Sequence, residues 1–325
     1  MIDLSTTYAG LKLKTPIIVS SSGLTNSVVR LKKIAGAGAG GAVLKSLFEE
    51  QILHETGTMS AHSDYPEAED YLRAYARENS IDNYLKMITS ARDIVDIPII
   101  ASINCVSSDE WVSFASEIEK AGASAIELNI YFLPNNKDKN PRDYENAYLD
   151  LVTKVKKKTS LPVIVKIGQG FTNITWIVNQ LYLRGASAVV LFNRFYAPDF
   201  NTDTFTYGSA DALSSPNDIR DSLRWVGIVS SQVKEMNIAS STGVHSGLAV
   251  IKQLLAGATA VQVCSVLYRN GIDYIRDMIS EMKKWMDKNN YSTVSEFRGR
   301  MNYGNLKDPS VYERVQFMKY FSQIH

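Results

Sequence analysis

Short hydrophobic runs alternate with longer amphipathic segments along this chain. Most of the runs are continuously apolar, which is typical of parallel strands covered on both faces. Eight runs have the length and composition of strands: residues 16–20 (PIIVS), 41–44 (GAVL), 98–104 (PIIASIN), 125–130 (AIELNI), 162–167 (PVIVKI), 188–193 (AVVLFN), 237–241 (NIASS) and 260–265 (AVQVCS). The pattern therefore predicts eight parallel strands.

The segments between these runs have helical spacing. Apolar positions recur every three to four residues in 111–121, 144–158 and 174–184, as on the buried face of an amphipathic helix. Several of the segments end at a glycine, a residue that commonly stops helices, and these glycines are Gly122, Gly185 and Gly257. We therefore expect a helix after each strand.

An alternating order of strands and helices repeated eight times has two common solutions, a closed barrel or an open doubly wound sheet. The open dinucleotide-binding sheet carries G-x-G-x-x-G after its first strand, whereas residues 20–27 read SSSGLTNS. The even spacing favours a TIM (β/α)8 barrel. We assign residues 1–290 to the barrel and residues 291–325 to a C-terminal helical extension packed on it.

Three stretches are too long to be simple connectors: residues 47–82, 131–143 and 194–222. Each follows an expected strand, so each is expected to form a long loop on the face of the barrel where the carboxyl ends of the strands meet. Loops on that face usually build the active site or cover it.

Composition excludes several classes of protein. The chain has 325 residues, 45% of them hydrophobic, and its charges nearly cancel to a formal net charge of +1, so no basic surface for nucleic acid is expected. The lysines at 154–158 are interpreted as a solvated helix end. No run reaches the ~18–20 apolar residues of a membrane span, and no secretion signal opens the sequence. We predict a cytoplasmic protein without a membrane partner.

Cysteine and histidine do not indicate a metal or a disulfide. Cys105 and Cys264 both lie in apolar runs, so we expect neither a disulfide framework nor a cysteine-ligated cluster. His54 and His62 stand eight residues apart beside several glutamates, a spacing that fits no compact ligand motif. We therefore expect no metal site.

Small and polar residues stand at the carboxyl ends of the expected strands, where barrels bind their ligands. They are Ser21, Ser22, Gly23, Lys45, Ser46, Asn104, Asn129, Lys166, Asn193, Thr242, Gly243, Val244, Cys264 and Ser265. Each alone is commonplace, but their joint placement suits a planar electron acceptor that carries a phosphate. Backbone amides near small residues cradle phosphate, and a lysine ammonium stabilises an anion on a reduced flavin ring. Asparagine amides offer donors and acceptors to ring edges and to polar substrates.

The order and spacing of these segments resemble the dihydroorotate dehydrogenase family between residue 11 and about residue 271. The matching segments are 10–16 (GLKLKTP) with Ser21-Ser22-Gly23, Lys45-Ser46, 127–129 (ELN), Lys166 in PVIVKIG, Asn193, 242–247 (TGVHSG) and 257–262 (GATAVQ) with Cys264-Ser265 and Gly271. The SLFEEQI, ELNIY and LFNRF segments are similar to a bacterial dihydroorotate dehydrogenase-like subgroup. The start of the chain close to the barrel resembles the soluble type of the family.

The resemblance implies an FMN enzyme that oxidises dihydroorotate to orotate in pyrimidine biosynthesis, or acts on a related small polar substrate. It implies that Lys166 contacts the flavin, and that amides near Thr242 and Cys264 hold the flavin phosphate. The implied substrate-binding residues are Asn129, Asn135, Asn193 and Arg194, and Lys45 is an implied catalytic residue.

The chain departs from the family pattern at the catalytic base. The family carries Cys or Ser in NxSCPN or NxSSPN, whereas residues 129–135 read NIYFLPN, with one extra residue before Pro134. Phe132 falls at the base position and cannot accept a proton, so Tyr131 is the expected catalytic replacement. The substrate loop NxxGLPN is also missing, since residues 77–82 read RENSID, and Arg194 replaces a serine.

Three functions follow from these observations. The first is a flavin-dependent oxidoreductase acting on dihydroorotate or a related substrate. The second is a lyase or aldolase that uses Lys166 as a Schiff-base nucleophile, and the third is a flavin-binding protein without turnover. The first is favoured because the phosphate-loop resemblance has no role in an aldolase without a cofactor. The sequence does not identify the electron acceptor, and we expect a homodimer.

Overall fold

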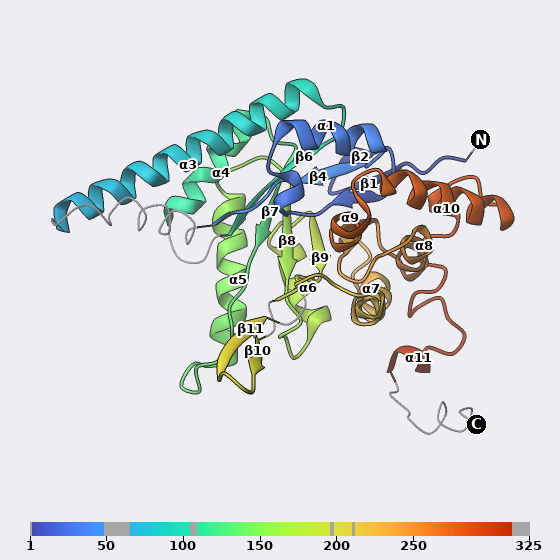
Figure 1. The fold of residues 1–325 in the computed structure, drawn as a ribbon. Helices are drawn as coiled ribbons and strands as arrows, with labels where there is room; N and C mark the ends of the chain where they lie inside the picture. Colours follow the sequence, from blue (N-terminus) through green and yellow to red (C-terminus); the bar gives the residue numbers. More distant parts are fainter. Residues whose placement is uncertain (1, 49–65, 105–108, 196–197, 210–211, 314–325) are drawn as a thin grey trace.

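The structure is a computed structural model that describes residues 2–48, 66–104, 109–195, 198–209 and 212–313 (Figure 1). Eight parallel strands form a closed ring. They are β3 (Ile17–Val19), β4 (Gly41–Val43), β6 (Ile99–Asn104), β7 (Ala125–Asn129), β8 (Val163–Ile167), β9 (Ala188–Leu191), β12 (Asn237–Ser240) and β13 (Ala260–Val263). Each strand pairs in parallel with the next around the ring, and the pairing of β4 with β6 closes it. The predicted TIM barrel is confirmed.

Helices lie around the ring, as Figure 1 shows. They are α1 (Val28–Ala37), α3 (Pro66–Ile94), α4 (Asp109–Ala121), α5 (Pro141–Lys156), α6 (Ile174–Leu183), α7 (Ile219–Gln232), α8 (Gly247–Ala256), α9 (Ser265–Asn270) and α10 (Tyr274–Lys288). Helix α5 begins where Asn140 accepts a hydrogen bond from the Arg142 amide and Pro141 occupies the first turn. Helix α8 ends at Gly257, whose φ of 114° is accessible chiefly to glycine.

The stretch 47–82, expected to be one long loop, is partly regular. It contains the short strand β5 (Leu47–Phe48), which pairs with β6, and the first half of α3. The loop prediction is wrong for these residues. Residues 66–80 read PEAEDYLRAYARENS, which favours a helix by composition but lacks the apolar stripe that would reveal one by periodicity. The stretch 194–222 holds the antiparallel hairpin of β10 (Pro198–Asn201) and β11 (Thr206–Ser209), then the turn η2 (Pro216–Asp218).

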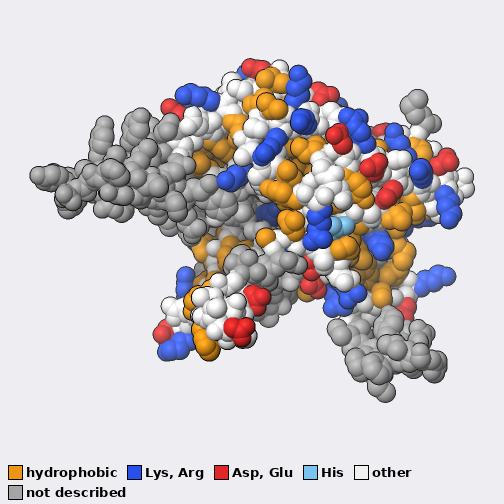
Figure 2. All heavy atoms as spheres, viewed as in Figure 1, with side chains coloured by type: hydrophobic (Ala, Val, Ile, Leu, Met, Phe, Trp, Pro, Cys, Tyr) orange, Lys and Arg blue, Asp and Glu red, His pale blue; other side chains and the backbone are white. Residues whose placement is uncertain are grey.

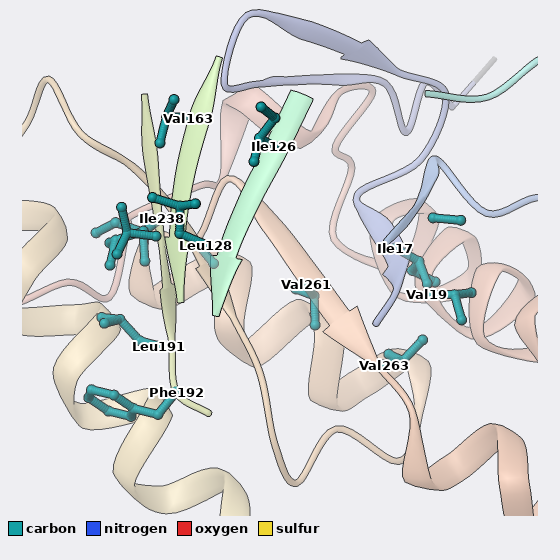
Figure 3. Close-up of a cluster of buried hydrophobic side chains, with 14 of the residues drawn as sticks. Ile17, Val19, Ile126, Leu128, Val163, Leu191, Phe192, Ile238, Val261 and Val263 are labelled. Carbon is teal, nitrogen blue, oxygen red and sulfur yellow. The ribbon is translucent and has the colours of Figure 1, made fainter. Parts of the chain in front are cut away.

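Side chains on each strand alternate between the helices and the barrel interior. Ile17 and Val19 pack outward in the large core, together with Leu128, Leu191 and Val261, as Figure 3 shows. The intervening residues form a second, inner cluster with the amino-terminal hairpin of β1 (Thr6–Tyr8) and β2 (Leu11–Leu13). Its members are Tyr8, Ala9, Leu13, Ile18, Val43, Ile100, Ala125, Ile164, Ala188, Val190, Ala239 and Ala260. The lower half of the barrel is therefore a packed apolar core closed by the hairpin.

Residues 291–313 contain the turn η3 (Val294–Glu296) and the four-residue helix α11 (Ser310–Glu313). Phe297 is fully buried and contacts Trp285 of α10 edge to face, with ring centroids 5.1 Å apart. Thr293 forms a parallel bridge with Asp3. The start of the proposed extension thus adds to the barrel core. The tail aromatics Phe317, Tyr320 and Phe321 lie outside the described residues, and the division at residue 290 stays a prediction.

The described surface shown in Figure 2 carries Lys and Arg side chains interspersed with Asp and Glu. The lysines that end α5 are largely solvated, and Lys156 donates to the carbonyl oxygen of Leu161 at 3.0 Å. No helix within the described part of the chain is long and apolar enough to cross a membrane.

Replacing Phe297 with alanine tests whether this segment belongs to the barrel. We expect Phe297→Ala to lower the free energy of unfolding by about 3–5 kcal/mol, because it empties a fully buried aromatic site. Urea unfolding followed by circular dichroism measures the change. The matched control is Phe205→Ala, a ring 91% exposed beside the β10–β11 hairpin, which should change stability by less than ~0.5 kcal/mol. If both variants changed the free energy of unfolding by the same small amount, residues 291–297 would not unfold cooperatively with the barrel.

Candidate functional site

A cavity of about 320 Å³ opens at the carboxyl ends of the barrel strands. Residues after β3, β9, β12 and β13 line it, together with Lys166 of β8 and the loop before η2. The lining residues are Ser20, Ser21, Lys166, Asn193, Arg194, Phe195, Ala212, Leu213, Ser214, Ser241, Thr242, Gly243, Val244, Gln262, Val263, Cys264 and Ser265. The parallel ring brings these separate segments together, because all of its strands end at the same face.

The floor of the cavity is a layer of buried polar side chains above the apolar inner cluster. The Lys166 ammonium donates to Ser20 Oγ at 3.0 Å and to Gln262 Oε1 at 2.9 Å. The Gln262 amide in turn donates to Glu127 Oε2. Burial raises the pKa of Glu127, against the lowering effects of the Lys166 charge and the Gln262 hydrogen bond. A cation is thus held inside the barrel by a chain of directed hydrogen bonds.

One wall of the cavity is a tight backbone turn. Thr242 and Gly243 both have φ of 76°, and a Cβ on Gly243 would lie 2.0 Å from the Ile219 nitrogen. Only glycine fits this position without moving the start of α7. The small residues of this turn line the cavity, and glycine-containing turns of this kind bind phosphate in many proteins.

Ser214 fastens the loop before η2 onto this turn. Its amide donates to Ser265 Oγ at 2.9 Å, and its hydroxyl accepts from the Gly243 amide at 3.3 Å. The same hydroxyl lies 3.1 Å from His245 Nε2. Burial and the nearby Arg269 cation lower the pKa of His245, so the imidazole is neutral at neutral pH. His245 therefore supports the loop beside the turn.

Two asparagines bridge the opposite side of the barrel mouth. Asn193 Nδ2 donates to Asn129 Oδ1 at 2.6 Å, which joins the end of β7 to the second residue after β9. Arg194 forms an ion pair with Asp218 at 2.6 Å, and the Ser215 amide also donates to that carboxylate. The Arg194 guanidinium borders the cavity with its charge already matched by Asp218.

A second cavity of about 470 Å³ lies beside the first, between the loop after β7 and the loop after β8. Phe195 borders both cavities, and Tyr131 stacks on it with ring centroids 3.6 Å apart. Phe132 packs edge to face on Tyr148 of α5, at 5.2 Å. The residue at the expected base position thus contacts a helix. Tyr131 lines the second cavity and is connected to the first through its stack on Phe195.

The remaining predicted site residues lie near the cavity without lining it. Ser46 shares a hydroxyl chain with Ser21 at 3.0 Å and with Ser102 at 2.7 Å. Lys45 precedes Ser46, and Ser22 and Gly23 form the start of the turn η1 (Gly23–Thr25). Asn104 ends β6 and has a buried Oδ1 without a hydrogen-bond partner among the described residues. Asn135 is exposed and lines neither cavity.

Several residues in the cavity or beneath it were not among the predicted site residues. Ser20, Gln262 and Glu127 share one signal, since each stands two residues beyond an inward apolar position on its strand. That period-two spacing could have found them. Ser214 and Phe195 come from irregular loops, and no local pattern indicates that they meet the cavity.

The residues fit a planar anion-bearing cofactor such as FMN. A buried ammonium, an orphaned Asn104 oxygen and the Asn129–Asn193 pair offer polar groups for a ring, and the glycine turn can accommodate a phosphate. Cys264 borders the turn, and burial raises the pKa of its thiol, which favours the neutral form. Within the described residues no cluster of His, Cys, Asp and Glu could hold a metal. His54, His62 and Cys105 lie outside the described residues.

Comparison with known proteins gives one consistent family. The sequence model of the family described as dihydroorotate dehydrogenase matches residues 3–286. The chain is 27% identical to the dihydroorotate dehydrogenase B (NAD(+)) catalytic subunit of Thermoplasma volcanium, over 92% of this chain and 98% of that protein. It is 28% identical to the protein of the same name in Methanocaldococcus jannaschii, over 91% and 97% of the two chains. The dihydropyrimidine dehydrogenase (NADP(+)) of Arabidopsis thaliana chloroplasts is 22% identical, over 91% and 76%.

Gly243 provides a test of the phosphate cradle. We expect Gly243→Ala to weaken the binding of flavin mononucleotide by at least about tenfold, or ~1.4 kcal/mol, because the added methyl group displaces the turn. Fluorescence titration of the flavin measures the dissociation constant. The control is Gly36→Ala in α1, where a Cβ meets nothing within 4 Å and φ is unexceptional. Unchanged binding by Gly243→Ala would show that this turn does not hold the ligand.

Proposed function

Because the chain belongs to the dihydroorotate dehydrogenase family, we propose that it is an FMN-dependent oxidoreductase that oxidises dihydroorotate or a related small polar substrate. The observation that carries the proposal is the cavity at the strand ends, which places a buried lysine on its floor and a glycine turn in its wall. The first group suits a flavin ring and the second suits its phosphate. Family membership makes the reaction class that of an oxidoreductase acting on CH–CH bonds.

FMN, when bound, would supply a planar acceptor for hydride. The side chain of Lys166 would hold positive charge against the ring, and the amides of Thr242–Val244 and Cys264–Ser265 would hold the phosphate. Asn129 and Asn193 stand at the mouth of the barrel, where they can orient a polar substrate. The Ser46 hydroxyl group lies behind Ser21 and would support this face of the site, and we retain Lys45, the residue before it, as a proposed catalytic residue.

In this chain a residue other than Cys or Ser has to accept the proton that leaves the substrate. Phe132 packs against α5 and carries no acidic or basic group. Tyr131 lines the neighbouring cavity and stacks on Phe195, which borders both cavities, so we propose its phenolic oxygen as the proton acceptor. The Tyr131–Phe195 stack would also form an aromatic wall against a planar substrate.

The hydrogen bonds of Lys166 favour the flavin function over an aldolase. A Schiff-base nucleophile must be a free amine, whereas Lys166 donates to two buried oxygens and lies near a buried carboxyl group. These hydrogen bonds occupy the amine group, so it is not open to attack a carbonyl carbon. The lysine therefore serves better as a fixed positive charge.

The names of the relatives support a multi-subunit setting. The proteins from Thermoplasma volcanium and Methanocaldococcus jannaschii are named as catalytic subunits of NAD(+) enzymes. We propose a cytoplasmic homodimer that passes electrons to an acceptor outside this chain. Co-purification of partners with this chain would identify that acceptor.

The function is tested in two steps. Purified protein is titrated with FMN by calorimetry, and the loaded protein is then mixed without oxygen with dihydroorotate in a stopped-flow instrument. Binding followed by loss of the oxidised flavin absorbance supports the proposal. Absence of FMN binding contradicts it, and binding without bleaching at high substrate indicates another substrate or a flavin-binding protein without this turnover. A borohydride-trapped adduct on Lys166 with a carbonyl compound would establish the aldolase.

Lys166→Met should slow the reduction of the flavin by dihydroorotate about 10²-fold, because one electrostatic contact to the developing charge is lost. Stopped-flow absorbance gives the rate constant. The control is Lys156→Met, which should leave the rate unchanged. Lys156 is the last residue of α5 and lies away from the carboxyl ends of the strands, where the cavity opens. If Lys166→Met reduced the flavin at a rate within twofold of the wild type, Lys166 would have no part in flavin reduction.

Tyr131→Phe should slow the same step by ~10²–10⁴-fold, because it removes the proton acceptor and keeps the ring stack with Phe195. Tyr182→Phe on α6 is a matched control, since Tyr131 is 36% exposed and Tyr182 is 37% exposed. Rapid bleaching by the Tyr131→Phe protein would show that the base lies elsewhere in the loops.

A further inference from the structure

Glu127 is buried inside the barrel yet lines neither cavity. Its side chain is 0% exposed, that of Gln262 is 1% exposed and that of Lys166 is 6% exposed. The three come from β7, β13 and β8, so the chain of contacts crosses the barrel interior. The proposed reaction uses Lys166 but gives no role to the carboxyl group beneath it.

The hydrogen-bonding groups of the three side chains fix the direction of this series of hydrogen bonds. An ammonium can only donate, so Gln262 must present its oxygen to Lys166. The Gln262 NH₂ group must then face Glu127, which has to accept. Ser20 adds a third contact, since its hydroxyl accepts from Lys166 and donates to Gln262 Oε1 at 3.1 Å. Glu127 accepts from the opposite end of the same amide and therefore reinforces this orientation of Gln262.

The Glu127 carboxyl group also affects the pKa values of the polar side chains around it. Burial raises the pKa of Glu127, and the Lys166 charge acts in the opposite direction. Burial raises the pKa values of the Tyr8 and Tyr84 phenols, and Glu127 adds to both shifts. Glu127 Oε1 and Tyr8 Oη are both buried without a hydrogen-bond partner among the described residues. Lys166 is thus the nearby cation that can stabilise a carboxylate in this apolar setting.

We propose that Glu127 is a positioning residue that acts through Gln262 to orient the Lys166 ammonium and to set the net charge beneath the flavin. This inference rests on the proposed function. The carboxylate partly neutralises the ammonium, so it limits how strongly the site prefers reduced, anionic flavin over oxidised flavin. The barrel floor therefore tunes the redox equilibrium of the cofactor as well as binding it.

The first test uses protein without flavin. Glu127→Gln keeps an acceptor for Gln262 but removes the charge, and it should raise the unfolding equilibrium constant at least tenfold. In a Lys166→Met background the carboxyl group, left without a cation, takes up a proton, so Glu127→Gln then exchanges one neutral group for another. In the Lys166→Met background, Glu127→Gln should therefore change the unfolding equilibrium constant by less than about twofold. Additive effects in this double-mutant cycle, measured by urea unfolding, would overturn the link.

The second test measures the cofactor equilibrium. The ratio of dissociation constants for oxidised and reduced FMN is obtained from the midpoint potentials of bound and free flavin, using reference dyes. Glu127→Gln should shift this ratio about tenfold toward the reduced form, or about 30 mV for a two-electron couple. In the Lys166→Met background the shift should vanish. An unchanged ratio in the otherwise native protein, or an equal shift in both backgrounds, would overturn the proposal.

Gln253→Met is the matched control for a merely structural effect. Gln253 is also fully buried, makes one side-chain hydrogen bond to Ser222 and has a buried oxygen without a partner among the described residues, but it lies on α8 outside the barrel. It should destabilise the protein without changing the flavin ratio. Failure of the wild type to bind FMN would contradict the proposed function, while the unloaded double-mutant cycle would still decide the role of Glu127.

Discussion

The positive charge of Lys166 has to be held inside a barrel whose lower half is apolar. A buried cation is costly unless it is hydrogen-bonded and compensated, and the strands that surround Lys166 supply both requirements. Ser20 and Gln262 accept its hydrogen bonds, and Glu127 lies at the far end of the Gln262 amide. The position of these residues on four different strands ties the chemistry of the site to closure of the ring.

The apolar layer beneath makes this arrangement rigid. Inward residues of all eight strands pack with Tyr8 and Leu13 of the amino-terminal hairpin, so the interior is filled from one end. Moving two residues along several strands changes the inward side chain from apolar to polar, as from Ala125 to Glu127 and from Ala260 to Gln262. The same alternation therefore fills the core at one end of the barrel and forms the polar floor of the cavity at the other.

The loops that follow the strands form the walls above this polar floor. Phe132 is turned toward α5, and the Tyr131–Phe195 stack separates the cavity at the strand ends from its neighbour. Ser214 fastens a further loop onto the glycine turn through the hydroxyl group of Ser265 and the amide of Gly243. A family fold can thus keep its cofactor site while the walls that face the substrate change.

The sequence by itself determined the strand and helix order, the closed barrel and the strand-end segments that line much of the cavity, because continuous apolar runs and period-3.6 patterns are local properties of the chain. It identified Lys166, Asn193, Thr242 and Cys264 for the same reason. Only the tertiary structure decided that Gln262 joins Lys166 to Glu127, that Phe132 faces a helix, and that Ser214 and Phe195 reach the cavity. It also extended α3 into a segment without an apolar stripe. These features depend on contacts between residues far apart in the chain, and no local pattern encodes which distant side chains will meet.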